Sequence, residues 1–193
     1  MTERIALIDL DGTVADYDSA MCEQMRAMQH PSEPLYGGRY VDGDEPAYVE
    51  HRRKLVQSTP GFWRNLKPLE RGFDVVLKLR EIGFSLHVLT KGPTSAPSAW
   101  SEKLEWSRRY MPDAAVTVTG EKSLVYGRVL VDDWPPYFEK WLAVRPRGLV
   151  VTVAQPWNAE YGASGKPRNS RVVHYDGSNL DEVEVRLRDQ FER

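Results

Sequence analysis

Cysteine, net charge and long apolar runs are all scarce in this 193-residue chain. The one cysteine, Cys22, excludes an intrachain disulfide and fits a reducing compartment. The net charge of -2 argues against a general nucleic-acid-binding surface, which is usually basic. No apolar run approaches the length of a membrane span, and no secretory signal is evident. We therefore expect a cytoplasmic location, and neither a membrane nor a nucleic-acid polymer as partner.

What the sequence does contain is a series of short apolar runs, most of them rich in Val, Ile and Leu. We predict β-strands at 5–10, 84–90, 115–118, 129–131 and 149–153. Helical spacing of apolar residues predicts helices at 73–80, 97–110, 136–144 and 179–191. Strands that alternate with helices predict an α/β fold, with a Rossmann-like, mainly parallel sheet and helices on both of its faces.

The long segment between the first two predicted strands breaks this alternation. It contains two helix-like stretches, 19–29 and 47–57, separated by a loop with several prolines and glycines. We predict that residues 15–70 form a small helical cap, inserted into a core made of residues 1–14 and 71–193. Such a cap would cover the site, exclude water and select the substrate. The alternative is a long crossover connection with extra packing helices.

Two of the predicted strands end in paired acids. Asp9 and Asp11 follow the first apolar run, and Asp132 and Asp133 follow the fourth. Ligands of open parallel α/β sheets bind at the carboxyl edge of the strands. Two carboxylates there repel each other unless they share a cation or a proton, and hard oxygen ligands suggest Mg²⁺. The pattern therefore predicts a metal-dependent active site, and the simpler alternative is a pair of surface acids at each strand end.

Two further positions offer groups that suit a phosphate. Thr90 ends the second apolar run, and Lys91 and Gly92 continue into a tight turn whose backbone N–H groups can hold phosphate oxygens. Lys122 is a compact cation that can neutralise a phosphoryl group. Taken singly, Thr90 also fits a capped turn, and Lys122 also fits a solvated surface lysine. Together with the two acid pairs, they predict an active site that handles phosphate.

These motifs resemble those of the haloacid dehalogenase (HAD) superfamily. Residues 9–13 match its Asp-x-Asp-Gly-Thr/Val signature, and Thr90, Lys122 and the second acid pair match its later motifs in the expected order. Within the superfamily, the chain looks like the 5'(3')-deoxyribonucleotidase family over most of its length. The stretches that carry this closer similarity are 60–69, 102–106 and 119–122. The resemblance implies a HAD-type core with a small cap, and a Mg²⁺-dependent phosphomonoesterase acting on nucleoside monophosphates, preferably deoxyribonucleotides.

The resemblance also implies roles for the acids. Asp9 would be the nucleophile that attacks phosphorus and forms an aspartyl-phosphate. Asp11 would be the general acid for the departing sugar oxygen, and then the base for the hydrolytic water. Asp9, the backbone carbonyl of Asp11, and Asp133 would hold Mg²⁺, while Asp132 would orient metal-bound water.

For the substrate, the resemblance implies that Thr90 and backbone N–H groups near Lys91 hold phosphate oxygens. Lys122 would balance charge on the phosphoryl group and the nucleophile. We expect Phe62 and Trp63 to stack on the base or to close the pocket, although both also fit ordinary core packing. Further aromatic candidates for the pocket are Tyr17, Tyr40 and Trp157.

The sequence leaves the substrate and the assembly open. Lys91 stands where the family usually has Ser or a similar small residue, and Gly120 stands where it has arginine. Base preference and the choice between 5'- and 3'-phosphates therefore stay open. Two alternatives also remain: a HAD phosphatase acting on another small phosphoester such as a sugar phosphate, and a non-catalytic nucleotide- or phosphate-binding protein with this fold. The oligomeric state is open too, with a homodimer as one option.

Overall fold

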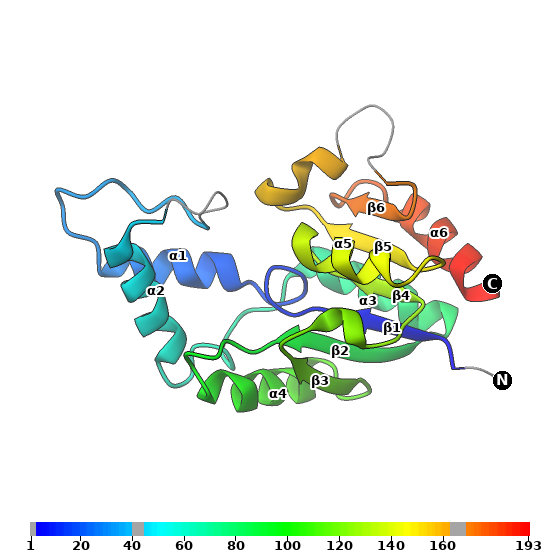
Figure 1. Cartoon of the computed structure of the whole chain (residues 1–193), viewed down its shortest axis with the longest axis horizontal. Helices are drawn as coiled ribbons and strands as arrows, with labels where there is room; N and C mark the ends of the chain where they lie inside the picture. The colour runs from blue at the N-terminus through cyan, green and yellow to red at the C-terminus, as the bar shows by residue number, and fades with distance from the viewer. Residues whose placement is uncertain (1–2, 40–44, 163–168) are drawn as a thin grey trace.

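The computed structural model describes residues 3–39, 45–162 and 169–193. Its centre is one sheet of six parallel strands in the order β3-β2-β1-β4-β5-β6 (Figure 1). The strands are β1 (Ile5–Ile8), β2 (Ser85–Lys91), β3 (Ala115–Thr119), β4 (Val129–Val131), β5 (Leu149–Val153) and β6 (Val172–Tyr175). The α-helices are α1 (Tyr17–Ala27), α2 (Ala47–Ser58), α3 (Glu70–Ile82), α4 (Ser98–Tyr110), α5 (Pro135–Ala143) and α6 (Leu180–Glu192), and the short 3-10 helices are η1 (Lys122–Leu124) and η2 (Pro156–Tyr161). The predicted α/β class is confirmed.

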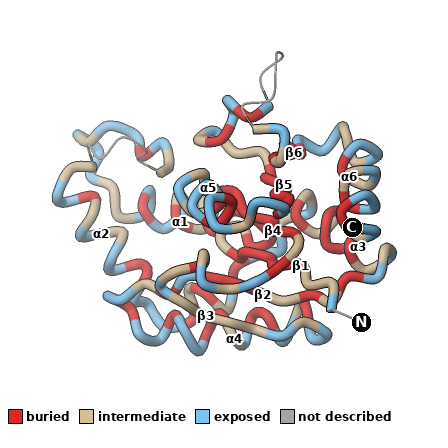
Figure 2. The backbone as a smooth tube through the Cα atoms, turned by 45° about the vertical axis from the view of Figure 1, so that its right-hand side comes forward, coloured by how far each residue is buried: buried red, intermediate tan, exposed pale blue. Residues whose placement is uncertain are grey.

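Two hydrophobic cores enclose the sheet, because successive residues of a strand point to opposite faces. Ala6 and Ile8 of β1 belong to the larger core, which also contains residues of α3, α4 and α6. Leu7 belongs to the smaller core, which contains Phe138 and Trp141 of α5. Helices therefore cover both faces, and the central strands are buried between them (Figure 2).

The segment between β1 and α3 leaves the sheet at the carboxyl end of β1, and its helices α1 and α2 project away from the strands (Figure 1). Its outgoing and returning connections run side by side. Asp16 N donates to Lys67 O at 2.8 Å, and Leu69 N donates to Val14 O at 2.8 Å. This paired crossing attaches the helical segment next to the strand end that carries the first acid pair.

The observed elements differ from the predicted ones mainly at their ends. β1 ends at Ile8, two residues before the predicted end, because the chain turns there: Leu10 O accepts N–H groups from Thr13, Val14 and Ala15. The sequence does not predict β6, since this edge strand has only four residues and lies outside any long apolar run. Within the described ranges, we find no helix with the length and apolar character needed to cross a membrane.

Candidate active site

The turn after β1 places the first acid pair at the carboxyl edge of the sheet. Asp9 is aligned with β4, since its N–H donates to Val131 O at 2.9 Å. Gly12 has a φ of 81°, and a Cβ atom there would lie 2.6 Å from Asp133 Oδ2. A larger residue would strain the backbone and collide with the second acid pair, which explains the glycine at this turn.

The second acid pair follows β4 and is fully buried. The Thr13 hydroxyl donates to Asp133 Oδ1 at 3.0 Å, and Trp157 Nε1 donates to Asp133 Oδ2 at 3.0 Å. Asp132 Oδ1 accepts the N–H of Trp134 at 2.9 Å. Groups from separate segments of the chain therefore fix the orientation of both carboxylates.

Three of these buried acids converge in one cluster. Ligand oxygens of Asp9, Asp132 and Asp133 all lie within 4.8 Å of one another. Burial raises the pKa of Asp132 to about 6. Burial and the adjacent Asp132 raise the pKa of Asp133 well above its ordinary value. Carboxylates this close repel one another unless they share a cation, so this set of hard oxygen donors fits a divalent ion such as Mg²⁺.

Lys122 lies within this acidic cluster. Its Nζ is 2.8 Å from Asp9 Oδ1, and it donates to Asp132 Oδ2 at 2.7 Å. Burial alone would lower the pKa of this ammonium, but Asp132 and Asp9 outweigh burial and raise the pKa. Lys122 is therefore a buried cation that neutralises part of the cluster.

A second buried lysine, Lys103 of α4, reaches the site from the other side, and the sequence motifs give it no role. It forms an ion pair with Asp11 Oδ2, and donates to Thr90 Oγ1 at 3.1 Å and to Lys91 O at 2.7 Å. Burial raises the pKa of Asp11 more than Lys103 lowers it, and the neighbouring Asp9 adds to the rise. The only signal for Lys103 in the sequence is its place in the 102–106 stretch, which does not indicate where its side chain points.

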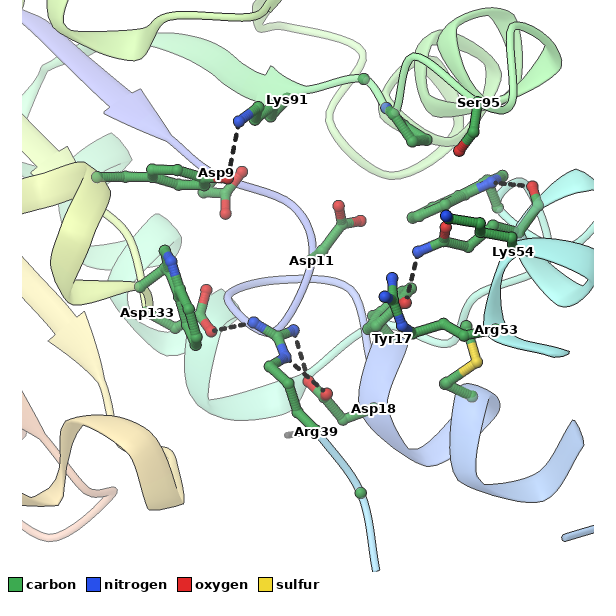
Figure 3. Close-up of a pocket in the computed structure, with 18 of the residues that line it drawn as sticks. Asp9, Asp11, Tyr17, Asp18, Arg39, Arg53, Lys54, Lys91, Ser95 and Asp133 are labelled. Atoms are coloured by element: carbon green, nitrogen blue, oxygen red, sulfur yellow. Dashed lines mark hydrogen bonds and ion pairs between the residues drawn. The ribbon is translucent and has the colours of Figure 1, made fainter. Parts of the chain in front are cut away.

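A cavity of about 580 Å³ opens above the strand ends and extends to α1 and α2 (Figure 3). The predicted site residues that line it are Asp9, Asp11, Trp63, Lys91, Lys122 and Asp133. Thr90 and Asp132 are also fully buried, and they do not line it. Phe62 also does not line it; its ring packs edge-on against Tyr17 and Trp63.

The far wall of the cavity, opposite the acids, presents aromatic rings. Tyr17 of α1 and Trp63 stack with ring centroids 5.3 Å apart. Gln57 of α2 ties them together: its amide donates to Tyr17 Oη at 2.9 Å, and its backbone carbonyl accepts from Trp63 Nε1 at 2.8 Å. Such a surface suits a planar group of the substrate.

Paired charges complete the far wall, and the sequence motifs do not predict them. Arg39 binds Asp18 through bonds of 3.2 and 3.3 Å, and its Nη1 lies 3.9 Å from Asp133 Oδ2 (Figure 3). Arg53 of α2 binds Glu45 through bonds of 2.7 and 2.9 Å. The partners are 21 and 8 residues apart along the chain, at spacings that form no motif. Because each cation has a carboxylate partner, the wall adds little net charge.

The remaining aromatic candidates have other positions. Trp157 does not line the cavity; the guanidinium carbon of Arg39 lies 4.2 Å from its ring centroid. Tyr40 lies outside the described residues.

Comparison with known proteins adds to this geometry. A sequence model of the family described as 5' nucleotidase, deoxy (pyrimidine), cytosolic type C (NT5C) matches residues 3–162. A protein of Bordetella bronchiseptica named "Putative 5'(3')-deoxyribonucleotidase" is 24% identical over 163 residues, which cover 81% of this chain and 86% of the relative.

Solved structures share the fold at low sequence identity. A HAD hydrolase of family IA, variant 3, from Entamoeba histolytica has a TM-score of 0.54 at 11% identity, with 100% of each chain covered. The magnesium-bound YfnB protein of Bacillus subtilis has a TM-score of 0.54 at 13% identity, over 97% of this chain and 99% of that chain. Since the family match extends over most of the chain, the protein belongs to the cytosolic type C 5'-nucleotidase family, a family of phosphatases, and has a HAD-type fold.

Proposed function

We propose that this protein is a Mg²⁺-dependent phosphomonoesterase that removes phosphate from nucleoside monophosphates, deoxyribonucleotides above all. The observation that carries the proposal is the position of Asp9, which lines the cavity, belongs to the acidic cluster and lies 2.8 Å from Lys122 Nζ. A carboxylate between cations can approach an anionic phosphate as a nucleophile. We place the reaction in the cytoplasm, because a chain with a single cysteine cannot form an intrachain disulfide and so does not depend on an oxidising compartment.

The first step transfers the phosphoryl group to the protein. A carboxylate oxygen of Asp9 forms a bond to phosphorus while the bond between phosphorus and the sugar oxygen breaks. Asp11 gives its proton to that oxygen, and the nucleoside leaves. The raised pKa of Asp11 suits a carboxyl that must carry a proton at this point.

The second step releases inorganic phosphate. Asp11, now ionised, takes a proton from a water molecule whose oxygen attacks phosphorus, and the bond from phosphorus to Asp9 breaks. Mg²⁺, when held by Asp9, Asp133 and the backbone carbonyl of Asp11, supplies positive charge that offsets the repulsion between the nucleophile and the phosphate. Asp132 keeps Lys122 in place through their 2.7 Å bond, and orients water at the cation site.

Hydrogen-bond capacity supports the phosphate roles. The ammonium of Lys122 has three protons, and the contacts with Asp9 and Asp132 use two, so one remains for a phosphate oxygen. Thr90 Oγ1 accepts from Lys103 and keeps its own O–H as a donor, but Thr90 lies behind the cavity lining, so its support is weaker than that of Lys122. Lys91, exposed at the cavity mouth, adds a further cation.

The far wall supports a nucleotide as substrate. We assign residues 15–70 as the cap, which brings the stacked rings of Tyr17 and Trp63 to the cavity that holds the acids. A base that stacks on an aromatic ring gains about 1–3 kcal/mol, whereas a sugar phosphate has no planar group to use this surface.

A substrate panel tests the proposal. Phosphate release is measured with 5'- and 3'-deoxyribonucleotides, ribonucleotides and small sugar phosphates, in Mg²⁺ and in EDTA. We expect hydrolysis of nucleotides in Mg²⁺ and its loss in EDTA, with recovery when Mg²⁺ is restored. Release from sugar phosphates but not from nucleotides would move the protein to the second candidate class, and no release from any phosphoester would overturn the enzyme proposal.

A further inference from the structure

Lys103 is the most deeply buried lysine of the site, with 1% of its surface exposed. Its ammonium contacts three acceptors: Asp11 Oδ2, Thr90 Oγ1 at 3.1 Å and Lys91 O at 2.7 Å. Its Nζ also lies 4.5 Å from the ring centroid of Trp63. One cation therefore joins the Asp11 carboxyl, the Thr90–Lys91 strand end and the aromatic wall.

The two buried lysines differ in what they can still bind. An ammonium has three N–H donors. Lys122 lines the cavity, and its contacts with Asp9 and Asp132 leave one donor for the substrate. Lys103 does not line the cavity, and its three acceptors use every donor. Lys103 therefore has no donor for phosphate and acts through its three partners, of which Asp11 is the one that transfers a proton in the proposed reaction.

Asp11 is held at one end only. Its Oδ2 is paired with Lys103, whereas its Oδ1 is buried and has no hydrogen-bond partner among the described residues. A buried acceptor without a partner costs about 1–3 kcal/mol. The Lys103 contact is thus the interaction that sets the orientation of this carboxyl. The carboxyl lines the cavity between Asp9 and Tyr17 (Figure 3).

The residue before Lys103 fixes the aromatic wall. Glu102 is 5% exposed, and its carboxylate accepts the N–H groups of Gly61 at 2.6 Å, Trp63 at 3.1 Å and Arg64 at 3.4 Å. Two consecutive residues of α4 therefore have separate tasks. Glu102 holds the turn that carries Trp63, and Lys103 holds the Asp11 carboxyl.

We propose that Lys103 is a positioning residue, which holds Asp11 where the carboxyl can give its proton to the departing sugar oxygen. This inference rests on the proposed phosphatase function and deepens it. As the Asp9–phosphorus bond forms and the phosphorus–oxygen bond breaks, the Asp11 proton moves to the sugar oxygen. Without Lys103, the carboxyl can turn about its side-chain bonds, and this proton transfer loses its geometry.

Comparing two leaving groups in the Lys103→Met variant tests this role. A sugar oxygen needs a proton in order to leave, whereas p-nitrophenolate leaves without one. Because Asp11 also serves the second step, which both substrates share, the first step is measured alone, as leaving-group release in a single turnover. We expect this rate to fall about 10²-fold or more for a deoxyribonucleoside monophosphate, and far less for p-nitrophenyl phosphate. Any change in KM should be similar for the two substrates, because Lys103 can affect phosphate binding only through Thr90 and Lys91, and the phosphate is common to both. Lys103→Gln keeps two donors and is expected to recover part of the loss.

The controls keep the inference separate from the proposed function. Lys78→Met removes a lysine of α3 that also has carboxylate partners, Glu81 and Glu184, and should leave both activities intact. If wild-type protein hydrolyses neither substrate, the proposed function is wrong. If wild type is active and the Lys103 variants lose both activities equally, or lose neither, the positioning role is wrong. If Lys103→Met does not fold, the test uses Lys103→Gln instead, and compares its loss of activity on the nucleotide with its loss on p-nitrophenyl phosphate.

Discussion

The floor and the far wall of the cavity are built in different ways. The floor, formed by Asp9, Lys122, Asp132 and Asp133, is buried at the carboxyl edge of the sheet. Lys122 contacts Asp9 and Asp132, and oxygens of the three acids lie within 4.8 Å of one another. The far wall is formed by described residues between Tyr17 and Trp63. Its charged side chains are partly exposed and pair with one another, and Arg39 also lies 3.9 Å from Asp133 Oδ2 of the floor. The floor is thus built into the strand ends of the sheet, whereas the wall is built outside the sheet and meets the floor through Arg39. We infer that the floor catalyses cleavage of the phosphorus–oxygen bond and that the wall determines substrate specificity.

The largest effect is expected from the floor. Asp9→Asn removes the proposed nucleophile but keeps the shape of the side chain, so kcat should fall by about 10⁴-fold or more. Circular dichroism should show an unchanged fold. The matched control is Asp16→Asn, because Asp16 caps α1 through a 3.2 Å bond from Ser19 N and lies outside the cavity lining. Asparagine is also a good N-cap, so this variant should stay active. Undiminished turnover by Asp9→Asn would refute the nucleophile assignment.

A smaller and different effect is expected from the wall. Trp63→Ala should raise the KM for nucleotides by about 5- to 100-fold, since stacking on a base is worth about 1–3 kcal/mol. The KM for p-nitrophenyl phosphate should change less. Phe62→Leu alters the adjacent ring that does not line the cavity, and should have a weaker effect than Trp63→Ala. A larger KM increase in Phe62→Leu would place the base against Phe62 instead.

The buried charges of the floor should also make stability depend on pH when no metal is bound. The pKa of Asp132 is raised to about 6, so the folded state binds more protons than the unfolded state between about pH 4 and 6. This group's contribution to stability therefore decreases as pH rises through that window. In EDTA, the free energy of unfolding of wild type minus that of Asp132→Asn should fall by about 1–2 kcal/mol between pH 4.5 and 7.5.

Taking this difference removes contributions that both proteins share. It keeps the effect of Asp132 on Asp133, whose pKa Asp132 also raises, and this effect has the same sign as the expected trend. His87 and His174 have lowered pKa values through burial, and their titration opposes the expected trend in each protein. Urea unfolding at several pH values gives the difference. A difference that increases with pH would show that Asp132 is not destabilised by its burial in the floor.

The smallest effect is expected at the cavity mouth. Lys91 is exposed, and its Nζ donates to Tyr137 Oη at 3.1 Å. Lys91→Ala should raise KM only about 2- to 5-fold, as expected for an exposed charge in water. The difference from wild type should shrink in high salt, because salt screens exposed charges. A loss in kcat comparable with that of Asp9→Asn would show that Lys91 acts in the catalytic step and not only in binding at the cavity mouth.

The floor could be predicted from the sequence because its acids follow apolar strands directly. A parallel sheet brings the carboxyl ends of β1 and β4 together, so Asp9 and Asp133 meet although they are far apart in the chain. The prediction failed to find Lys103, which reaches Asp11 across 92 residues from the side of a helix. The contact between Lys103 and Asp11 depends on how α4 packs against the sheet, and no local sequence pattern predicts that packing.

The far wall was harder to predict for the same reason. Phe62 and Trp63 are adjacent aromatic residues, and their chemistry does not say which ring faces the cavity. Glu102 settles this by binding the backbone of the turn that carries Trp63. Arg39 and Asp18 pair across 21 residues, and this contact depends on how the chain after α1 returns to that helix.

The relative efficiency with a nucleotide and its sugar phosphate tests the central claim most directly. In saturating Mg²⁺, kcat/KM is measured for deoxythymidine 5'-monophosphate and for deoxyribose 5-phosphate. Both lose phosphate from the 5-oxygen of deoxyribose, and only the nucleotide carries a base. We predict that the nucleotide exceeds the sugar phosphate by at least about tenfold, because only the nucleotide has a base to stack on the far wall. Equal values, or a preference for the sugar phosphate, would contradict the claim that this phosphatase selects nucleotides.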